Sequence, residues 1–434
     1  MTPPPDRVAR TMLSWHSLEL ISCTTIQTLW AGYGQICAIK AKATTDEAAK
    51  HLDELFGVQV QVHSSTGTGR GTVYPLILKL ISPPQKQNTA RGKETEDEGH
   101  LRKMLSYQVE QCFYSDVVPR FGGGVAVAGC LASTREMVDR TGEFEGGEEL
   151  EGLMAIVMVD LRVKYPVAGE KRSVLSEAQV HGALDWLAGF HGRSWSLLPE
   201  NLDGCVLPPL EEAKRRQGMN TNGVGSGNGL WLNGGYTYLA TRRKEYESLA
   251  RDTYSEWSEA LCRNQEGSSM SIAEMVALFL TPHGRPIESY IHGDVKSENL
   301  FTTKNGDEVA FFDFQYVGLG LGVCDLAKLF TCSVPLDMLD DAGDSLPERL
   351  TMRDGEKRLL ERYRSSLLQH GENNSYEWDT FRRHWETALV DWCRFQASWG
   401  FWGNTEWLEA RVRSILSDQE WRDWLRREVE GQSL

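Results

Sequence analysis

The sequence predicts an α+β protein with two lobes, a small one covering residues 1–155 and a larger, mostly helical one covering residues 156–434. Two observations favour this division. Short segments before residue 155 alternate polar and apolar side chains as strands do, whereas from Leu175 on the apolar residues recur at helical spacing. A chain of 434 residues also exceeds what one hydrophobic core ordinarily supports. We therefore expect an antiparallel sheet with one helix, followed by a helical lobe.

The composition is that of a globular protein with no affinity for nucleic acid. Hydrophobic residues make up 41% of the chain and charged residues 25%. A net charge of -15 argues against a general nucleic-acid binder, because phosphate backbones are held by basic surfaces. Nine cysteines without a C-x-x-C pair predict reduced thiols and a cytoplasmic location. The polar N-terminal segment does not resemble a signal peptide, and no apolar run reaches the roughly 20 residues that span a bilayer, so no membrane partner is expected.

The first lobe is expected to begin with a helix, a glycine-containing connection and a strand. Ser17 to Trp30 is mixed in polarity and predicts a short helix, whereas Cys37 to Lys42 alternates like a strand. Between them, Gly32 and Gly34 flank an aromatic residue. Glycines in such a place let the backbone close over phosphate groups without a Cβ in the way. A plain hairpin turn explains the same residues equally well.

A later strand carries a single lysine among apolar residues. Val73 to Ile81 reads VYPLILKLI, and Lys79 shares its face with two isoleucines, so its charge needs a partner. Alternation from Val58 to Val62 predicts a further strand before it. The intervening turn, Ser64 to Thr72 (SSTGTGRGT), is either a phosphate cradle or a hairpin tip.

One helix and two strands complete the predicted first lobe. The helix is expected from His100 to Ser115 and contains Glu110. The strands are expected at Val125 to Ala132 and at Leu153 to Val159, separated by an acidic, glycine-rich loop.

The second lobe is predicted to be helical from its start to its end. Ser176 is a plausible N-cap for a helix that runs to Trp195. Gln217 to Tyr238 is rich in glycine and asparagine, and is either a mobile substrate lid or a surface loop anchored by aromatic residues. The region from Trp385 to Trp424 is rich in tryptophan. Its rings either bind an apolar ring system or a cationic acceptor, or simply pack the last helices together.

The clearest chemistry lies between Tyr290 and Gln315, which reads YIHGDVKSENLFTTKNGDEVAFFDFQ. One apolar run leads to Asp294, with Lys296 and Asn299 shortly after it, and a second leads to Asp313. Phosphoryl transfer needs a carboxylate that orients and deprotonates the acceptor hydroxyl, and oxygen ligands for Mg²⁺. We predict that Asp294 is the base and that Lys296 stabilises the transferring charge. Asn299 and Asp313 are the predicted metal ligands, brought together from the ends of two adjacent strands.

The rival interpretation is that these are ordinary turn residues between strands. It does not account for the order D-x-K-x-x-N followed by D-F-x, each after its own apolar run.

At these residues the sequence resembles the protein-kinase-like superfamily, in its small-molecule branch of aminoglycoside phosphotransferases, choline kinases and ecdysteroid-kinase-like proteins. H-G-D at 292–294 and D-F-Q at 313–315 replace the H-R-D and D-F-G of protein kinases, and are similar to the ecdysteroid-kinase-like branch. The resemblance implies a two-lobed kinase-like fold, ATP and Mg²⁺ as cofactors, and a role for Asp325 in supporting the catalytic loop. The L-A-G-F-H-G run that contains His191 is also similar to this branch, where it forms a core helix, so His191 is expected to be structural.

The resemblance further implies which residues bind phosphates. Lys79 would hold the α- and β-phosphates and pair with Glu110. Gly32 and Gly34 would form the shortened glycine loop, which favours the Ser64–Thr72 turn as a hairpin tip.

By the same resemblance, Met158 and Asp160 lie where the hinge carries the adenine. Contacts at a hinge are mostly made by the backbone. Asp160 is expected either to contact the ribose or to cap the next segment.

The predicted function is ATP- and Mg²⁺-dependent phosphorylation of a hydroxyl group on a small molecule. A protein kinase is disfavoured because the chain runs directly from Asp313 to Asp325, with no room for an activation segment. A non-catalytic interaction module is disfavoured because the polar residues of the site are all present. The sequence leaves open the acceptor, the oligomeric state and the alternative of nucleotidyl transfer.

Overall fold

The structure is a computed structural model that describes residues 3–57, 69–84, 97–137, 140–218, 229–341, 343, 345–371 and 375–432. Internal contacts divide the chain into two compact units. The first comprises Met1–Lys164 and Pro209–Gly229, and the second comprises Tyr165–Pro208 and Leu230–Leu434. The boundary expected near residue 155 falls inside a strand, β5 (Met154–Val159), which this first unit contains as a whole.

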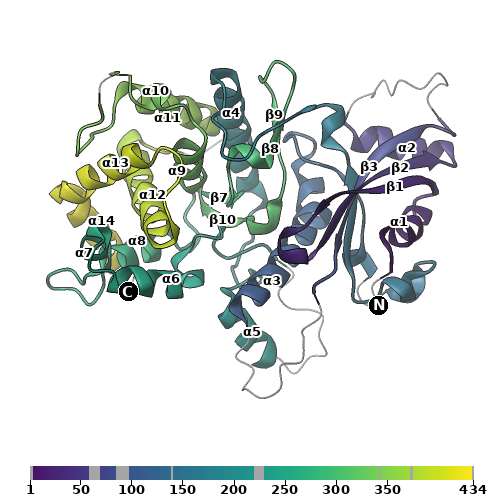
Figure 1. The fold of residues 1–434 in the computed structure, drawn as a ribbon, viewed down its shortest axis with the longest axis horizontal. Helices are drawn as coiled ribbons and strands as arrows, with labels where there is room; N and C mark the ends of the chain where they lie inside the picture. The colour runs from purple at the N-terminus through teal and green to yellow at the C-terminus, as the bar shows by residue number, and fades with distance from the viewer. Residues whose placement is uncertain are drawn as a thin grey trace. The chain divides into compact units, whose positions relative to one another are not determined.

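The first unit is built on an antiparallel sheet, as predicted, and its five strands have the order β1-β2-β3-β5-β4. Figure 1 labels β1, β2 and β3 of this sheet. Lys79 lies opposite Ile36 of β2 and Ile156 of β5, in the central strand β3. The elements of this unit are α1 (Pro5–Ser14), β1 (Leu18–Thr28), β2 (Gly34–Ala43), α2 (Asp46–Leu55), β3 (Val73–Ile81), α3 (Glu98–Cys112), β4 (Cys130–Ser133), β5 and α5 (Pro209–Gly218).

The helix predicted over Ser17 to Trp30 is wrong, because this segment forms β1. β1 pairs along its length with β2, from Leu18 opposite Ala43 to Thr28 opposite Gln35. Its β-branched residues suit an extended backbone, and cross-strand pairing outweighs a weak local preference. β1 lies at the edge of the sheet and most of its side chains are exposed, which explains its mixed polarity.

The second unit is mostly helical, and its longest helix, α12 (Trp378–Trp399), packs against α6, α8, α9 and α13. Ser176 caps α4 with a complete capping box, as predicted. The other helices are α4 (Glu177–Ser194), α6 (Arg243–Arg251), α7 (Glu256–Cys262), α8 (Ile272–Leu280), α9 (Val323–Cys332), α10 (Leu336–Leu339), α11 (Asp354–Leu367), α13 (Thr405–Ser417) and α14 (Gln419–Gln432).

Two small sheets carry the residues between Tyr290 and Gln315. β7 (Glu288–Ile291) pairs with β10 (Gly318–Leu321), whereas β9 (Val309–Phe311) pairs with β8 (Leu300–Thr302), which also pairs with β6 (Val167–Ala168). The expectation that Asn299 and Asp313 come from the ends of two adjacent strands is confirmed, because Asn299 directly precedes β8 and Asp313 follows β9. The strand that leads to Asp294, β7, belongs to the other of the two small sheets.

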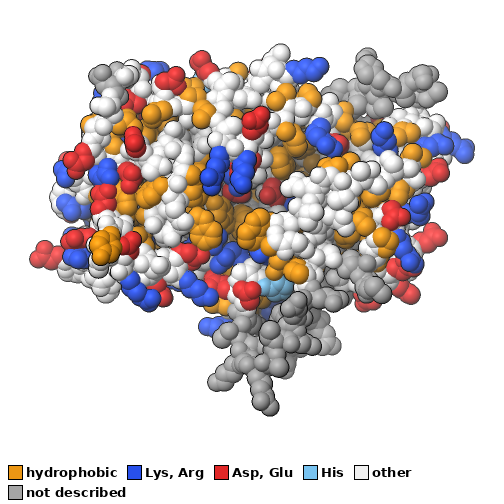
Figure 2. All heavy atoms as spheres, in the orientation of Figure 1, with side chains coloured by type: hydrophobic (Ala, Val, Ile, Leu, Met, Phe, Trp, Pro, Cys, Tyr) orange, Lys and Arg blue, Asp and Glu red, His pale blue; other side chains and the backbone are white. Residues whose placement is uncertain are grey.

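Of the two purposes considered for the tryptophan-rich region, packing of the last helices is observed, whereas ligand binding stays a prediction. Trp385, Trp407 and Trp421 are completely buried and pack the last helices, whereas Trp399 is 57% exposed. Hydrophobic side chains also reach the surface among charges of both signs on the face shown in Figure 2. Because scattered apolar exposure is ordinary, only exposed rings that line a concave site suggest binding.

Three predicted segments fall wholly or partly outside the described residues. These are the strand at Val58 to Val62, most of the Ser64–Thr72 turn, and the centre of the Gln217–Tyr238 segment. Among the residues that are described, no helix combines the length and the apolar character needed to cross a membrane.

Candidate functional site

The loop after β7 holds Asp294 through its neighbours in sequence. The Asn299 Nδ2 atom donates to the Asp294 backbone oxygen at 2.9 Å and to its Oδ2 atom at 3.0 Å. Lys296 Nζ lies 3.0 Å from the same Oδ2. Asp294 is only 9% exposed, so these contacts fix the carboxylate. Its Oδ1 atom has no such partner within the described part of the chain, and is the oxygen left for a ligand.

His292 joins this loop to the strand that leads to Asp313. Its Nδ1 atom accepts from the Asp294 backbone N–H at 3.2 Å, so Nε2 carries the proton and donates to the Phe312 oxygen at 2.9 Å. Burial lowers the pKa of His292, although the charges of Asp325 and Asp294 oppose that shift. A neutral ring in one tautomer is what these two hydrogen bonds require.

Asp325, at the start of α9, binds the backbone of the loop that contains Asp294. Its carboxylate accepts from the N–H groups of His292 at 2.7 Å and Gly293 at 2.9 Å. His191 Nε2 lies 3.2 Å away, and His191 Nδ1 is 2.7 Å from the Tyr363 hydroxyl. Burial raises the pKa of Asp325, but the hydrogen bond and charge of His191 outweigh burial and lower it. The expected supporting position of Asp325 and the structural position of His191 are both observed.

Gly293 occupies a place that no other residue can take. Its φ is +83°, and a Cβ would lie 2.3 Å from the Tyr316 oxygen and 2.7 Å from the Gly235 nitrogen. The glycine at the centre of H-G-D is therefore needed for close backbone packing.

Asn299 and Asp313 come from the same end of a strand pair. Asn299 directly precedes β8, Asp313 follows β9, and Leu300 lies opposite Phe311 in the antiparallel ladder. The Phe312 N–H continues the ladder by donating to the Asn299 oxygen at 3.0 Å. Asp313 has a left-handed φ of +66°, which is uncommon outside glycine.

These two residues fit a magnesium ion by their donor atoms. The Asn299 amide nitrogen is committed to Asp294, so its oxygen is available to a cation, and Asp313 supplies a carboxylate. Mg²⁺ prefers such oxygen ligands. Gln315 Nε2 donates to Asp313 Oδ1 at 2.7 Å and orients this carboxylate. Within the described residues no group of three or more His, Cys, Asp or Glu side chains could hold a metal.

In the first unit, the predicted partners Lys79 and Glu110 are brought together. Lys79 Nζ lies 2.6 Å from Glu110 Oε2, and the two side chains are 6% and 3% exposed. Lys79 also lies over the Tyr107 ring, 5.7 Å from its centroid. A buried charge pair of this kind fixes the position of the ammonium group.

The other residues predicted to bind the nucleotide also lie in the first unit. Gly34 has a φ of +147°, and a Cβ there would lie 2.1 Å from the Leu80 oxygen, so glycine is required where β2 meets β3. Gly32 has a φ of +74° and open space where a Cβ would be. Met158 is buried in β5, and Asp160 caps the next turn by accepting from the Arg162 N–H at 3.0 Å. Of the two roles weighed for Asp160, the cap is therefore present.

A cleft of about 310 Å³ opens beside Asp294 and Lys296 in the second unit. We call it the aromatic cleft, because five of its lining residues are Tyr236, Trp392, Trp399, Phe401 and Trp402. Its charged lining residues are Lys171, Arg172, Lys296, Lys328, Asp294 and Glu298. A cleft that joins a fixed carboxylate to aromatic walls can hold a small molecule.

The profile of the ecdysteroid kinase-like family matches residues 88–349, more than half of the chain. The chain belongs to the ecdysteroid kinase-like family. Its family assignment makes this chain a small-molecule phosphotransferase. The matched range includes Glu110, Asp294, Asn299, Asp313 and Asp325, and it begins after Lys79.

Solved structures of other kinases are similar at low identity. A macrolide 2'-phosphotransferase from Brachybacterium faecium is 10% identical, over 96% of this chain and 99% of that chain, with a TM-score of 0.38. A Plasmodium vivax ethanolamine kinase is 12% identical, over 94% of this chain and 84% of that chain, with a TM-score of 0.37. A choline kinase from Cryptosporidium parvum is 10% identical, over 96% of this chain and 91% of that chain, with a TM-score of 0.35. No curated protein matches the chain.

In this ecdysteroid kinase-like chain, sequence reasoning missed Lys328 and Tyr236. Lys328 Nζ donates to the Gly293 backbone oxygen at 2.7 Å, in the loop after β7. Lys328 lies one helical turn after Asp325 on α9, and this spacing could have revealed it. Tyr236 lines the aromatic cleft, and burial, followed by the charge of Asp294, raises its pKa well above the usual value. No signal in the sequence links Tyr236 to Asp294.

Proposed function

We propose that this protein transfers the γ-phosphoryl group of ATP, with Mg²⁺, to a hydroxyl group of a small molecule, and that it does so in the cytoplasm. The observation that carries the proposal is the fixed carboxylate of Asp294 between Asn299 and Lys296, at the wall of the aromatic cleft. The location rests on nine free cysteines, which suit a reducing compartment.

Asp294 acts as the base in the proposed reaction. Its Oδ2 atom is held by Asn299 and Lys296, which leaves Oδ1 to accept the proton of the acceptor hydroxyl. A base placed within hydrogen-bond reach contributes a factor of roughly 10² to 10⁴ in rate. Orientation of the hydroxyl toward the phosphorus adds to this effect.

Asn299 and Asp313 would hold Mg²⁺ through their side-chain oxygens. When bound, the ion would neutralise charge on the nucleotide phosphates. Lys296 provides a further positive charge beside Asp294. Burial lowers the pKa of Lys296, but the charge and hydrogen bond of Asp294, with Glu298 and Asp313, outweigh burial and raise it. The lysine therefore stays charged at neutral pH and can stabilise the transferring group.

The nucleotide is assigned to the residues of the first unit. Lys79, fixed by Glu110, would bind phosphate oxygens, and Gly32 and Gly34 would bring the backbone close to the phosphates. Met158, with Asp160 after it, would place backbone groups against the adenine.

The test is thermal stability with and without MgATP, for the wild type and for Asp313→Asn. Asparagine tolerates the left-handed φ of this position and can keep the hydrogen bond from Gln315, so the variant removes mainly the charge. A ligand at about 100 times its Kd should raise the free energy of unfolding by about 2.7 kcal/mol. We expect this gain in the wild type, its loss with EDTA, and a much smaller gain in Asp313→Asn.

A wild type that does not respond to millimolar MgATP would contradict the proposal and favour a non-catalytic interaction module. If MgATP stabilises the protein, ADP release in the presence of candidate alcohols identifies the acceptor. Release of pyrophosphate in place of ADP would instead indicate nucleotidyl transfer.

A further inference from the structure

Arg242 lies against the rings that form one wall of the aromatic cleft. Its guanidinium carbon is 5.1 Å from the ring centroid of Trp399, 5.4 Å from that of Tyr236 and 5.8 Å from that of Phe395. Trp399 and Tyr236 line the cleft, whereas Arg242 does not. The arginine therefore places a positive charge behind two of the rings that a ligand would meet.

This charge is fixed in place by buried contacts. Arg242 is 5% exposed, its Nε atom donates to the Tyr236 oxygen at 2.7 Å, and its Nη1 atom lies 3.2 Å from Glu245 Oε1. Tyr236 itself packs edge-on against Phe395 at 5.4 Å. Glu245 balances part of the charge, but the guanidinium stays stacked on the rings.

The charged side chains that line the cleft sum to a net positive charge, the same sign as that of Arg242. Lys171, Arg172, Lys296 and Lys328 stand against Asp294 and Glu298. Lys296 lies near both acids, at 3.0 Å from Asp294 and 3.8 Å from Glu298. Four cationic side chains therefore face two acidic ones, and the net positive charge of the described lining disfavours a cationic ligand.

We propose that Arg242 excludes cationic acceptors, so that the aromatic cleft takes an acceptor that is uncharged or anionic where it meets the rings. The proposal concerns which molecules the aromatic cleft binds. It rests on the proposed function only in that the bound molecule is taken to be the acceptor of the phosphoryl group. An aromatic face attracts a cation through its quadrupole. Here a buried cation already uses the Trp399 and Tyr236 rings, and a second cation on their other faces would be repelled by it.

The experiment compares two probes of the same shape. Choline and its uncharged carbon isostere, 3,3-dimethylbutan-1-ol, differ only in the quaternary nitrogen. Each is titrated into the full-length protein by calorimetry, with tryptophan fluorescence as a second signal because Trp392, Trp399 and Trp402 line the cleft. The measured quantity is the ratio of the two dissociation constants.

Three variants separate the charge of Arg242 from its packing. Arg242→Met removes the charge and Arg242→Lys keeps it, although both lose the stacked guanidinium. Arg285→Met is the matched control. Arg285 also stacks on a ring, that of Phe279 at 4.9 Å, and pairs with a glutamate three residues later, but Phe279 does not line the cleft.

We expect the wild type to bind the alcohol at least tenfold more tightly than choline. Arg242→Met should reduce this ratio about tenfold, and Arg242→Lys and Arg285→Met should keep it. A wild type that prefers choline, that binds neither probe, or that shows the same ratio as Arg242→Met would overturn the proposal. The outcome does not depend on MgATP, so it is separable from a failure of the proposed phosphoryl transfer.

Discussion

Asp325 shows how one buried carboxylate organises the loop that contains Asp294. It accepts from two consecutive backbone N–H groups and from His191, and its pKa is lowered although burial raises it. Lys328, one turn further along α9, holds the Gly293 oxygen from the same helix. The backbone beside Asp294 is therefore held by two residues of one helix.

A second buried residue, His384, predicts how stability changes with pH. It lies in α12, and its Nδ1 atom is 2.6 Å from the Tyr376 hydroxyl. Burial, followed by the charge of Arg285, lowers its pKa to about 3. In the unfolded chain the pKa returns to about 6.5, so below that pH the unfolded state binds a proton that the folded state does not. The contribution of His384 to the free energy of unfolding is therefore fully present above pH 6.5, and it is lost as the pH falls from 6.5 toward 3.

We expect His384→Gln to make the protein less sensitive to acid. From pH 7 to pH 5, the free energy of unfolding of the wild type should fall by about 2 kcal/mol more than that of the variant. Urea unfolding at both values measures this difference. The exposed His283, changed to Gln, is the control and should behave as the wild type does. Equal acid sensitivity of wild type and His384→Gln would show that the buried ring does take up a proton.

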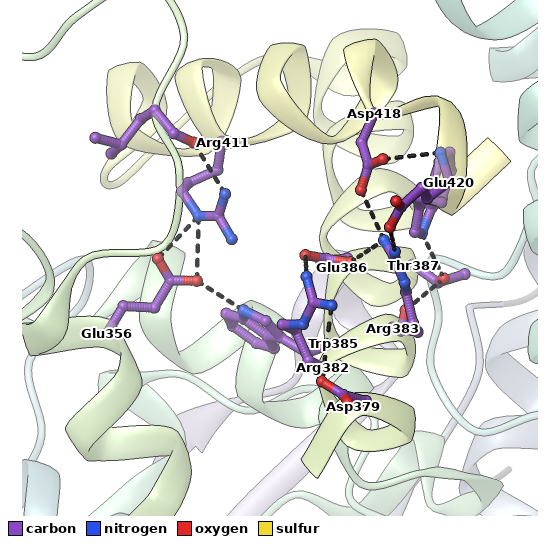
Figure 3. Close-up of polar contacts among 12 residues, drawn as sticks. Glu356, Asp379, Arg382, Arg383, Trp385, Glu386, Thr387, Arg411, Asp418 and Glu420 are labelled. Atoms are coloured by element: carbon purple, nitrogen blue, oxygen red, sulfur yellow. Dashed lines mark hydrogen bonds and ion pairs between the residues drawn. The ribbon is translucent and has the colours of Figure 1, made fainter. Parts of the chain in front are cut away.

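At the scale of elements, a buried ion pair ties three helices of the second unit together. Glu356 of α11 lies 2.8 Å from Arg411 of α13 and accepts from the Trp385 indole of α12 at 2.7 Å (Figure 3). Glu356 is fully buried and Arg411 nearly so. Arg411 also donates to the Leu350 oxygen at 2.9 Å. Loss of one partner would leave the other charge buried and unpaired.

We therefore expect strong coupling between Glu356 and Arg411. Arg411→Met should lower the free energy of unfolding by about 3–5 kcal/mol, whereas adding Glu356→Gln to it should recover part of that loss. A double-mutant cycle by chemical denaturation measures the coupling. The exposed pair of Arg263 and Glu259, at 2.8 Å, serves as the control and should couple by less than about 1 kcal/mol. Additive effects at Glu356 and Arg411 would mean that the buried pair is no stronger than this surface pair.

At the scale of the whole molecule, the residues assigned to the nucleotide and those assigned to phosphoryl transfer belong to different compact units. Lys79 and Glu110 belong to the first unit, and Asp294, Asn299 and Asp313 to the second. Nucleotide binding and phosphoryl transfer should therefore be separable by substitution.

We expect Lys79→Met to reduce the stabilisation by MgATP, because it removes the charge assigned to the phosphates. Asp294→Asn should keep most of that stabilisation, yet lower the rate of phosphoryl transfer by roughly 10² to 10⁴. Thermal shift and ADP release measure the two effects. Exposed Lys50→Met is the control for loss of a lysine and should leave both unchanged. If Lys79→Met and Asp294→Asn reduce both quantities alike, the division of roles is wrong.

The sequence by itself determined the α+β architecture and the residues with chemistry to offer. Strand alternation placed Lys79 in a strand, and the spacing of D-x-K-x-x-N followed by D-F-x singled out Asp294, Asn299 and Asp313. These signals are local, because side-chain period and turn composition are set by a few neighbouring residues.

Only the tertiary structure decided which segments pair and what surrounds each polar group. β1 is a strand because β2 lies beside it, and the strands that lead to Asp294 and Asp313 belong to different sheets. The same holds for Arg242. Its charge lies over the rings of Phe395 and Trp399, which belong to a helix well over a hundred residues further along the chain. Pairing, burial and electrostatic contact join residues that are distant in sequence, and no local pattern records them.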